Sequence, residues 1–248
     1  MYIGRIVAIA RTKDNRGAAL YRVSSRSFPN RMAKTLANAV AIVPKPGFEN
    51  DIQKNPYIAY DCLRLANGYA IVTNGSQTDP IAEKIASGMA PRDALAYVML
   101  SMDYEHDSLD TPRISAVVTP DGSKGWLAIV RKDALLVREF ALKPGEAYYV
   151  ATYEKNRPAD DQNEPNFTPM TAEEACDLIL GTKGGVFAVF EKPVTAVCAV
   201  ANADGSFATA TQDFAYKWEG PAPAGPVTRS RDPPKCMKMR RLCPAQKA

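Results

Sequence analysis

Short apolar runs with the length and alternation of β-strands fill the first third of the chain. They cover residues 2–10, 18–25, 37–44, 57–66 and 69–75. Asn67-Gly68 separates the last two runs, and an Asn-Gly pair between apolar runs is the strongest short signal for a β-hairpin. We therefore predict a sheet in this part of the chain, with a hairpin turn at Asn67-Gly68.

Three later segments have the capping residues and the apolar spacing of helices. Asp79-Pro80 predicts an N-cap followed by proline at the first helical position, and Gly88 is expected to end this helix. The stretch 91–107 also begins with proline, and its apolar residues recur three and four positions apart. The stretch 171–180 opens with a Thr-x-x-Glu capping box, which predicts a third helix.

A second group of strands follows the first two helices. These strands are predicted over residues 113–122, 125–133, 134–142 and 146–153, and then over 186–191, 194–202 and 206–214. The polar stretch 154–167 is expected to be a surface loop. Two groups of strands with helices between and after them predict an α+β fold, in which two sheets pack together and helices flank them.

The last thirty residues differ in composition from the rest of the chain. Of 31 Lys and Arg and 27 Asp and Glu residues, the stretch 219–248 holds seven basic and two acidic ones. The other 24 basic and 25 acidic side chains leave residues 1–218 close to neutral, so charge does not support nucleic-acid binding by this part. We expect one domain over 1–218, and a Pro-rich basic tail over 219–248 that is disordered.

Histidine and cysteine usage excludes several classes of site. His106 is the only histidine, and the five cysteines contain no Cys-x-x-Cys pair. A multi-histidine metal site, a structural zinc site and a disulfide scaffold are therefore not expected. No run of about 18 apolar residues occurs, so we expect no membrane helix. The first run contains Arg5 and no cleavage site follows it, which favours a strand in a cytoplasmic protein over a signal peptide.

The stretch YRVSSRSFPNR, residues 21–31, concentrates arginines and hydroxyl groups where a predicted strand ends. Arginine presents a planar fork of donors to phosphate or carboxylate oxygens, and serine hydroxyls and turn N–H groups can complete an anion site. An edge strand with solvated charges explains the composition equally well. The chain contains neither GxxxxGK[ST] nor GxGxxG, so a phosphate site would have to use these arginines and hydroxyls.

Three further segments carry candidate polar groups. Tyr57 and Tyr60 are three apart, so on a strand one can pack while the other points into a cavity, although ordinary packing explains both. The loop 72–80 joins a strand to a helix and can direct N–H groups at an anion or a base edge, or can simply connect the two. The acidic stretch 102–110 opposes the dipole of the preceding helix, which makes Glu105 a candidate general acid or base.

Seven segments together resemble the archaeal-type inosine-monophosphate (IMP) cyclohydrolase family. They are MYIGRIVAIART, YRVSSRSFPNR, KNPYIAYDCLR, VTNGSQTDPIAEKI, DYEHDSLDTPRI, LAIVRKDALLVREF and YYVATYE. The similarity runs in order from Met1 to about residue 215, and RVSSRSFPNR is its most specific motif. The tail 219–248 lies outside it.

The resemblance implies a four-layer α/β/β/α sandwich like that of N-terminal-nucleophile hydrolases, with two central sheets between helices. The predicted strands and helices fit this fold and other two-sheet folds alike. The chain begins Met1-Tyr2, without the Ser, Thr or Cys that such a nucleophile requires. We therefore expect the fold to be reused without its usual nucleophile.

The resemblance also implies an activity, IMP cyclohydrolase, the last step of purine nucleotide synthesis. In the formamido-imidazole-carboxamide ribotide (FAICAR), the carboxamide nitrogen attacks the formyl carbon, and the resulting carbinolamine loses water to give IMP. This ring closure requires no metal, redox cofactor or covalent intermediate. Family members form homo-oligomers, mostly tetramers, so FAICAR, IMP and further copies of the chain are the expected partners.

Carried over residue by residue, the resemblance implies catalytic roles for Arg31, Tyr60 and Glu105. Arg31 would stabilise charge on the formyl oxygen and lower the pKa of Tyr60, Tyr60 would relay a proton, and Glu105 would orient or deprotonate the carboxamide. Five residues would bind substrate: Arg26, Ser27, Asn30, Asn74 and Gly75. The first three would hold the 5′-phosphate and ribose, and the last two would shape the base pocket.

Other functions stay open at this point. A related amide-bond hydrolase on the same fold would need a free Ser, Thr or Cys at its N-terminus. A non-catalytic regulator would bind IMP or AMP without converting FAICAR, but the presence of Arg31, Tyr60 and Glu105 argues against it. The basic tail is a third candidate, for binding nucleic acid.

Overall fold

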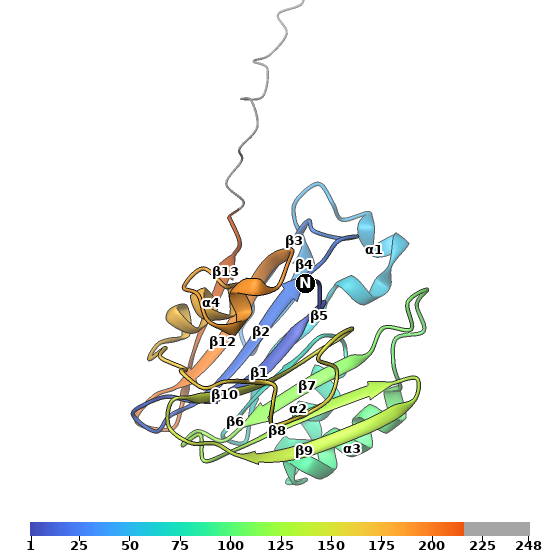
Figure 1. The fold of residues 1–248 in the computed structure, drawn as a ribbon. Coiled ribbons are helices and arrows are strands. Elements are labelled where there is room, and N and C mark those ends of the chain that lie inside the picture. The colour runs from blue at the N-terminus through green and yellow to red at the C-terminus, as the bar shows by residue number, and fades with distance from the viewer. Residues whose placement is uncertain (216–248) are drawn as a thin grey trace, which may run out of the picture. The chain divides into compact units, whose positions relative to one another are not determined.

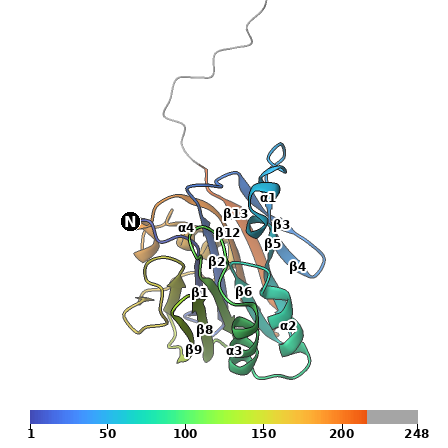
Figure 2. The same ribbon diagram turned by 90° about the vertical axis from the view of Figure 1, so that its right-hand side faces the viewer.

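Two antiparallel sheets form the centre of the computed structural model, which describes residues 1–215 (Figures 1 and 2). The first sheet has six strands, in the order β11 (Asn163–Glu164), β10 (Glu146–Ala151), β1 (Ile6–Arg11), β2 (Gly17–Ser24), β12 (Pro193–Ala201) and β13 (Phe207–Asp213). The second sheet has seven, in the order β3 (Arg31–Thr35), β4 (Ala39–Pro44), β5 (Tyr60–Ala66), β6 (Tyr69–Thr73), β7 (Arg113–Val118), β8 (Lys124–Arg131) and β9 (Ala134–Ala141). The predicted α+β class with two packed sheets is confirmed.

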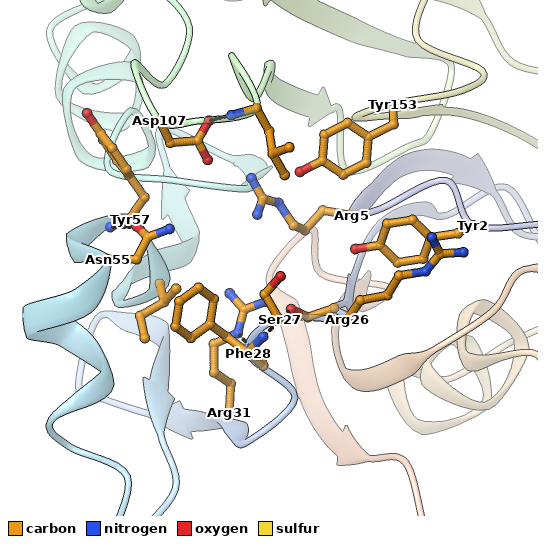
Figure 3. Close-up of a pocket in the computed structure, with 13 residues that line it drawn as sticks. Tyr2, Arg5, Arg26, Ser27, Phe28, Arg31, Asn55, Tyr57, Asp107 and Tyr153 are labelled. Atoms are coloured by element: carbon orange, nitrogen blue, oxygen red, sulfur yellow. Dashed lines mark hydrogen bonds between the residues drawn. The ribbon is translucent and has the colours of Figure 1, made fainter.

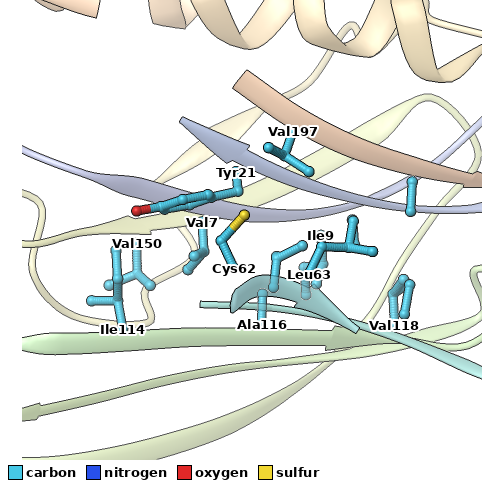
Figure 4. Packing of buried hydrophobic residues seen from close by; sticks show 14 of the residues in the cluster. Val7, Ile9, Tyr21, Cys62, Leu63, Ile114, Ala116, Val118, Val150 and Val197 are labelled. Atoms are coloured by element: carbon cyan, nitrogen blue, oxygen red, sulfur yellow. The ribbon is translucent and has the colours of Figure 1, made fainter. Parts of the chain in front are cut away.

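The main hydrophobic core lies between the two sheets (Figure 4). The first sheet contributes Val7, Ile9 and Tyr21, and the second contributes Leu63 and Ile114; all five are at most 2% exposed. Strands β2 and β12 are buried along their whole length, which explains their nearly continuous apolar sequence. Stacked sheets exclude water from both inner faces, so polar atoms there need partners of their own.

Helices cover the outer faces of both sheets. Helix α4 (Ala172–Leu180) packs on the first sheet, in a second cluster with β1, β2, β10 and β12. Helices α2 (Thr78–Ala86) and α3 (Pro91–Met102) pack on the second sheet, in a third cluster. Figure 1 shows α4 and the α2–α3 pair on opposite sides of the two sheets. The short helix α1 (Asp51–Lys54) and two 3₁₀ turns, η1 (Pro56–Ile58) and η2 (Val186–Val189), complete the elements.

Two predictions with specific turn or capping chemistry are confirmed. Strands β5 and β6 form the hairpin, and Asn67 and Gly68 have φ angles of 48° and 78°, as a type I′ turn requires. Thr171 is the N-cap of α4, and its side chain accepts a hydrogen bond from the Glu174 N–H at 3.3 Å. At the start of α4, the local residues alone specify the structure.

The structure differs from the predicted strands at three places. The strand predicted over 186–191 is wrong, because Gly184 and Gly185, with φ angles of 83° and 74°, turn the chain into η2. Strand β3 has the polar sequence RMAKT, without the alternation that predicts a strand, and forms because β4 pairs along it. Within the expected surface loop 154–167, residues Asn163–Glu164 add the short strand β11 to the first sheet.

The predicted helix boundaries are also wrong at two points. Helix α2 begins at Thr78 after the N-cap Gln77, so Asp79 lies in the first turn and receives a hydrogen bond from Arg64 Nη1 at 2.5 Å. Helix α3 ends at Met102, because Asp103 has a φ angle of 57°. Glu105 therefore lies in a loop, and opposition to the helix dipole does not explain its acidic surroundings.

Two predictions are not tested by the fold. The domain boundary at residue 218 stays a prediction, and the tail 219–248 lies outside the described residues. Within residues 1–215 no helix is both long and apolar enough to cross a membrane.

Arg22 is a fully buried charge on β2 that fixes the region around η2. Its guanidinium donates hydrogen bonds to the backbone carbonyls of Ile179, Phe187 and Phe190 at 3.1, 3.0 and 2.5 Å, and its Nε donates to Ser24 Oγ at 2.9 Å. One side chain thus satisfies carbonyls at the end of α4 and along η2. The arginines of the 21–31 stretch therefore have different roles, and that of Arg22 is structural.

We expect Arg22→Met to lower the free energy of unfolding by about 3 kcal/mol, because each carbonyl left without a donor costs roughly 1–3 kcal/mol. Urea unfolding measures this change. The matched control is Arg92→Met, which removes an arginine that is 71% exposed and pairs with Asp93; it should change stability by less than about 0.5 kcal/mol. Equal effects of the two substitutions would contradict the structural role of Arg22.

Candidate active site

A cavity of about 330 Å³ opens at one end of the two sheets, a size typical of small-molecule sites (Figure 3). Its walls come from the residues before β1, the connection between β2 and β3, the turn η1, the loop after α3 and the end of β10. Four aromatic side chains and three arginines face it: Tyr2, Phe28, Tyr57, Tyr153, Arg5, Arg26 and Arg31. The cavity is therefore aromatic and positively charged.

The connection between β2 and β3 carries the chain from the first sheet to the second along the cavity wall. Ser25 Oγ accepts a hydrogen bond from the Phe28 N–H at 2.9 Å, and Arg31 Nε donates to the Phe28 carbonyl at 3.1 Å. These two bonds hold the turn that the Phe-Pro-Asn sequence begins. They place Arg26 and Ser27 at the mouth of the cavity and Arg31 deeper inside.

Arg31 and Arg5 bring buried N–H groups to the cavity. Arg31 is 1% exposed, and among residues 1–215 its Nη1 has no hydrogen-bond partner. The Nε of Arg5 is likewise buried, and no group in the described part of the chain accepts from it. Because buried donors on a charged group are seldom left unpaired, these N–H groups mark where oxygen atoms of an anionic ligand would bind.

Glu105 is held behind Arg5. Its Oε2 accepts a hydrogen bond from Arg5 Nη2 at 3.1 Å, and Arg113 Nη1 lies 3.9 Å from Oε1. Burial raises the pKa of Glu105, and the charges of Arg5 and Arg113 only partly oppose this. Oε1 has no hydrogen-bond partner within residues 1–215. The carboxyl group therefore has one oxygen committed and one available, and it is a stronger base than an exposed glutamate.

The loop that carries Glu105 is fixed by Asp107. One oxygen of the Asp107 carboxylate accepts from the Leu109 and Thr111 N–H groups, at 3.1 and 2.9 Å, and the other accepts from Thr111 Oγ1 at 2.8 Å. The Glu105 N–H donates to the Thr111 carbonyl at 2.8 Å. The acidic stretch thus supplies Asp107, whose carboxylate holds the loop in shape, and Glu105, whose buried carboxyl group the loop keeps in place.

Tyr60 lies next to the cavity at the start of β5, and its Oη is 2.6 Å from Tyr21 Oη. Burial raises the pKa of Tyr60, while Arg31 and Arg5 lower it by less. The expected effect of Arg31 on Tyr60, a lowering of its pKa, is present, but desolvation outweighs it and the net pKa is raised. Tyr60 therefore keeps its proton at neutral pH and can donate it. Because of the two arginines, its pKa is lower than burial alone would make it.

The residues predicted to bind phosphate and ribose divide into two groups. Arg26 and Ser27 line the cavity and are exposed. The guanidinium carbon of Arg26 lies 4.2 Å from the ring centroid of Tyr2, and its Nη2 is 3.4 Å from Glu191 Oε2. Asn30 does not line the cavity, and its carbonyl accepts from the Lys45 N–H.

Asn74 and Gly75 also lie outside the cavity wall, where Asn74 bonds backbone groups at the start of β7 and Gly75 lies beside Arg113 and Glu105. The Asn74 amide donates to the Pro112 carbonyl at 2.9 Å, and its oxygen accepts from the Ile114 N–H at 2.8 Å. A Cβ on residue 75 would lie 2.7 Å from Arg113 Nη1 and 3.3 Å from Glu105 Oε1. The residue must therefore be glycine for these two side chains to approach each other.

Five residues of the site have roles that the sequence did not indicate: Tyr2, Arg5, Tyr21, Arg113 and Tyr153. Arg5 was visible as a single charge inside an apolar run, which was the available signal. The others look like ordinary strand residues, because their partners come from segments distant in the sequence. Within residues 1–215, no three His, Cys, Asp or Glu side chains are grouped as metal ligands, and His106 is exposed.

Guanidinium N–H groups that find no acceptor within residues 1–215, close to a buried phenol and a buried carboxyl group, indicate an acid–base enzyme with a small anionic substrate. Comparison with known proteins agrees with this class and narrows it. The model of a family described as IMP cyclohydrolase-like protein matches residues 2–205. The chain belongs to this family.

Curated relatives cover most of the chain. A protein of Methanosphaera stadtmanae named IMP cyclohydrolase is 46% identical over 204 residues, which span 82% of this chain and 96% of that protein. Proteins with the same name from Methanocella arvoryzae and Methanocaldococcus jannaschii are 47% and 43% identical, over 79% and 83% of this chain and 90% and 96% of their own. The resemblance inferred from the sequence is confirmed.

We expect Gly75→Ala to lower kcat about tenfold or more, because the added methyl group displaces Arg113 and Glu105 from their present positions. Steady-state kinetics with the substrate proposed below measures this change.

The matched control is Gly125→Ala on β8, where a Cβ would lie 2.8 Å from Ile9 Cδ1 in the core between the sheets. Both variants should lose about 1–3 kcal/mol of stability by overpacking. Only Gly75→Ala should lose turnover in proportion to folded protein. A similar loss in both would mean that Gly75 acts on stability alone.

Proposed function

We propose that the protein is an IMP cyclohydrolase, which converts FAICAR to IMP by forming one C–N bond and releasing water. Its membership of the IMP cyclohydrolase-like family, and relatives of that name along most of its length, support this function. The observation that carries the proposal is Arg31, a buried arginine whose Nη1 has no acceptor within residues 1–215 and which lines the cavity.

Ring closure sets three demands on the site. The carboxamide nitrogen is a poor nucleophile, so the substrate must be held with this nitrogen close to the formyl carbon. The formyl oxygen gains negative charge as the bond forms and needs donors. Protons must leave the nitrogen and reach the oxygen that departs as water. In this proposal the cavity positions the substrate. Arg31, Tyr60 and Glu105 supply the donors to the oxygen and transfer the protons.

Arg31 and Tyr60 act on the formyl oxygen in this proposal. The free Nη1 of Arg31 donates to the oxygen as charge develops, and Tyr60 then gives it the phenolic proton. The raised pKa of Tyr60 keeps that proton in place at neutral pH until the oxygen becomes basic enough to take it. The carbinolamine hydroxyl forms in this way.

Glu105 acts on the nitrogen side. Its free Oε1 takes the proton from the attacking carboxamide nitrogen, and Arg5 keeps the other oxygen fixed. In the dehydration step the Glu105 carboxyl returns that proton to the departing hydroxyl, and the Tyr60 phenolate takes the proton of the former formamide nitrogen. Both residues then have their starting protonation, and the substrate has lost one water molecule.

We assign the 5′-phosphate to Arg26 and Ser27 at the mouth of the cavity. Arg26 is paired with Glu191 at 3.4 Å between groups that are about half exposed, which is a weak interaction that a phosphate can replace. Asn30, at the end of the turn between β2 and β3, would help to hold the ribose by fixing the shape of this turn. For Asn74 and Gly75, predicted to shape the base pocket, the contacts favour an indirect role through Arg113 and Glu105.

The proposed fold is the four-layer α/β/β/α sandwich of N-terminal-nucleophile hydrolases. The helices α4 on one side and α2 and α3 on the other, with two sheets between them, support this assignment. A homo-oligomer such as the family's tetramer, and a cytoplasmic location, stay predictions.

The first experiment incubates purified protein with FAICAR, without added metal or cofactor, and follows IMP formation spectroscopically. We expect Tyr60→Phe to lower kcat by at least about 100-fold, because a general acid contributes roughly 10²–10⁴-fold, while IMP binding is retained. Tyr69→Phe, which alters a tyrosine packed against Trp126 on the outer face, is the control and should keep full activity. Normal turnover of Tyr60→Phe would exclude the proton transfer.

Arg26→Ala should raise KM for FAICAR about tenfold and change kcat little, because a phosphate contact binds ground state and transition state alike. Steady-state kinetics separates the two constants. Arg92→Ala, on the outer helix α3, is the control and should leave both unchanged. An unchanged KM for Arg26→Ala would mean that the phosphate binds elsewhere.

A further inference from the structure

The hydroxyl groups of Tyr21 and Tyr60 form a buried pair that joins the two sheets. Tyr21 comes from β2 of the first sheet and Tyr60 from β5 of the second, and their Oη atoms are 2.6 Å apart. Tyr21 is fully buried and Tyr60 is 8% exposed. A short hydrogen bond between two buried phenols strongly couples their proton equilibria.

Packing does not explain why residue 21 carries a hydroxyl group. The ring of Tyr21 lies in the core between the sheets, near Val7, Ile114 and Val150, where a phenylalanine ring would fill the same space (Figure 4). A buried hydroxyl costs free energy unless it is bonded, and Tyr60 Oη is its partner. The hydroxyl of Tyr21 therefore serves the contact with Tyr60.

The charged and titratable groups that face this pair favour ionisation of Tyr60 over Tyr21. Arg31 and Arg5 both lower the pKa of Tyr60, and Arg5 also lowers that of Tyr21. The buried thiol of Cys62 has a pKa raised well above its usual value and stays neutral. Burial raises the pKa of Tyr21 well above the usual value, and the hydrogen bond to Tyr60 raises it further. The same bond lowers the pKa of Tyr60. Once Tyr60 has lost its proton, its oxygen can only accept, so in that state the Tyr21 hydroxyl is the donor.

We propose that Tyr21 is a positioning residue for ring closure, whose hydroxyl donates to Tyr60 Oη and stabilises the phenolate left when Tyr60 gives its proton to the carbinolamine oxygen. This inference rests on the proposed function. The Tyr60 O–H bond breaks, its proton goes to the oxygen of the intermediate, and the phenolate keeps the hydrogen bond from Tyr21 and the charges of Arg31 and Arg5. Tyr21 itself never loses its proton.

Tyr21→Phe should lower kcat for FAICAR about 10- to 100-fold, as expected for loss of one hydrogen bond to a charged group, with KM nearly unchanged. Activity requires protonated Tyr60 and falls as pH rises through its pKa. Without the donor the phenolate is less stable and this pKa rises, so the alkaline limb of the kcat profile should move to higher pH. An unmoved limb would overturn the proposal.

A double-mutant cycle tests whether Tyr21 acts through Tyr60. In the Tyr60→Phe background, Tyr21→Phe should have no further effect on kcat; a further loss of tenfold or more would overturn the proposal. The control Tyr149→Phe removes a hydroxyl from another buried tyrosine, packed against Phe187 in the second cluster, and should keep wild-type kinetics. Thermal unfolding verifies that each variant is folded.

Ultraviolet titration of tyrosine ionisation separates failure of this inference from failure of the proposed function. The transition that disappears in Tyr60→Phe belongs to Tyr60, and it should lie at higher pH in Tyr21→Phe than in the wild type. This measurement needs no substrate. If the wild type fails to convert FAICAR but the transition moves, the proposed function is wrong and the coupling of the two phenols stands; an unmoved transition removes the coupling whatever the activity.

Discussion

The ion pair between Arg5 and Glu105 is the contact on which the site depends. Both side chains are largely withdrawn from water, and a buried charge that loses its partner costs about 3–5 kcal/mol. Arg5 also faces Tyr60, Tyr21 and Tyr153, so one guanidinium sets the electrostatics of the carboxyl and phenol groups together. Its own position follows from β1, the strand it precedes, which lies between β2 and β10 in the first sheet.

The two sheets make different contributions around this pair. The first sheet supplies Arg5 just before β1 and Tyr21 within β2, and the second supplies Arg31 and Tyr60 at the starts of β3 and β5. The connection from β2 to β3 joins them and also carries Arg26 and Ser27 to the mouth of the cavity. A substrate bound there contacts residues of both sheets, so the site exists only when the sheets are packed.

The sequence predicted the parts of the fold with local causes, such as the Asn67-Gly68 hairpin and the capped helix α4. It failed where other segments decide: β3 is a strand because β4 pairs with it, and α3 stops at Asp103, which has a φ angle of 57° and whose carbonyl accepts from Arg113 Nε. For the site, the resemblance pointed to Arg31, Tyr60 and Glu105, which the structure brings to one region. Arg5 and Tyr21 escaped notice, because their importance comes from partners about a hundred and about forty residues away in the chain.

The hydrogen bond between Tyr21 on β2 and Tyr60 on β5 makes the acidity of Tyr60 depend on the spacing of the two sheets. Stacked sheets lie about 10 Å apart, and an O–H···O hydrogen bond requires the two oxygens to lie about 2.5–3.0 Å from each other. The size of the apolar side chains between the sheets therefore fixes how readily Tyr60 holds its proton. The volume of the core and the acidity of Tyr60 are thereby coupled, so residues that do not line the cavity take part in setting the acidity of the proposed proton donor.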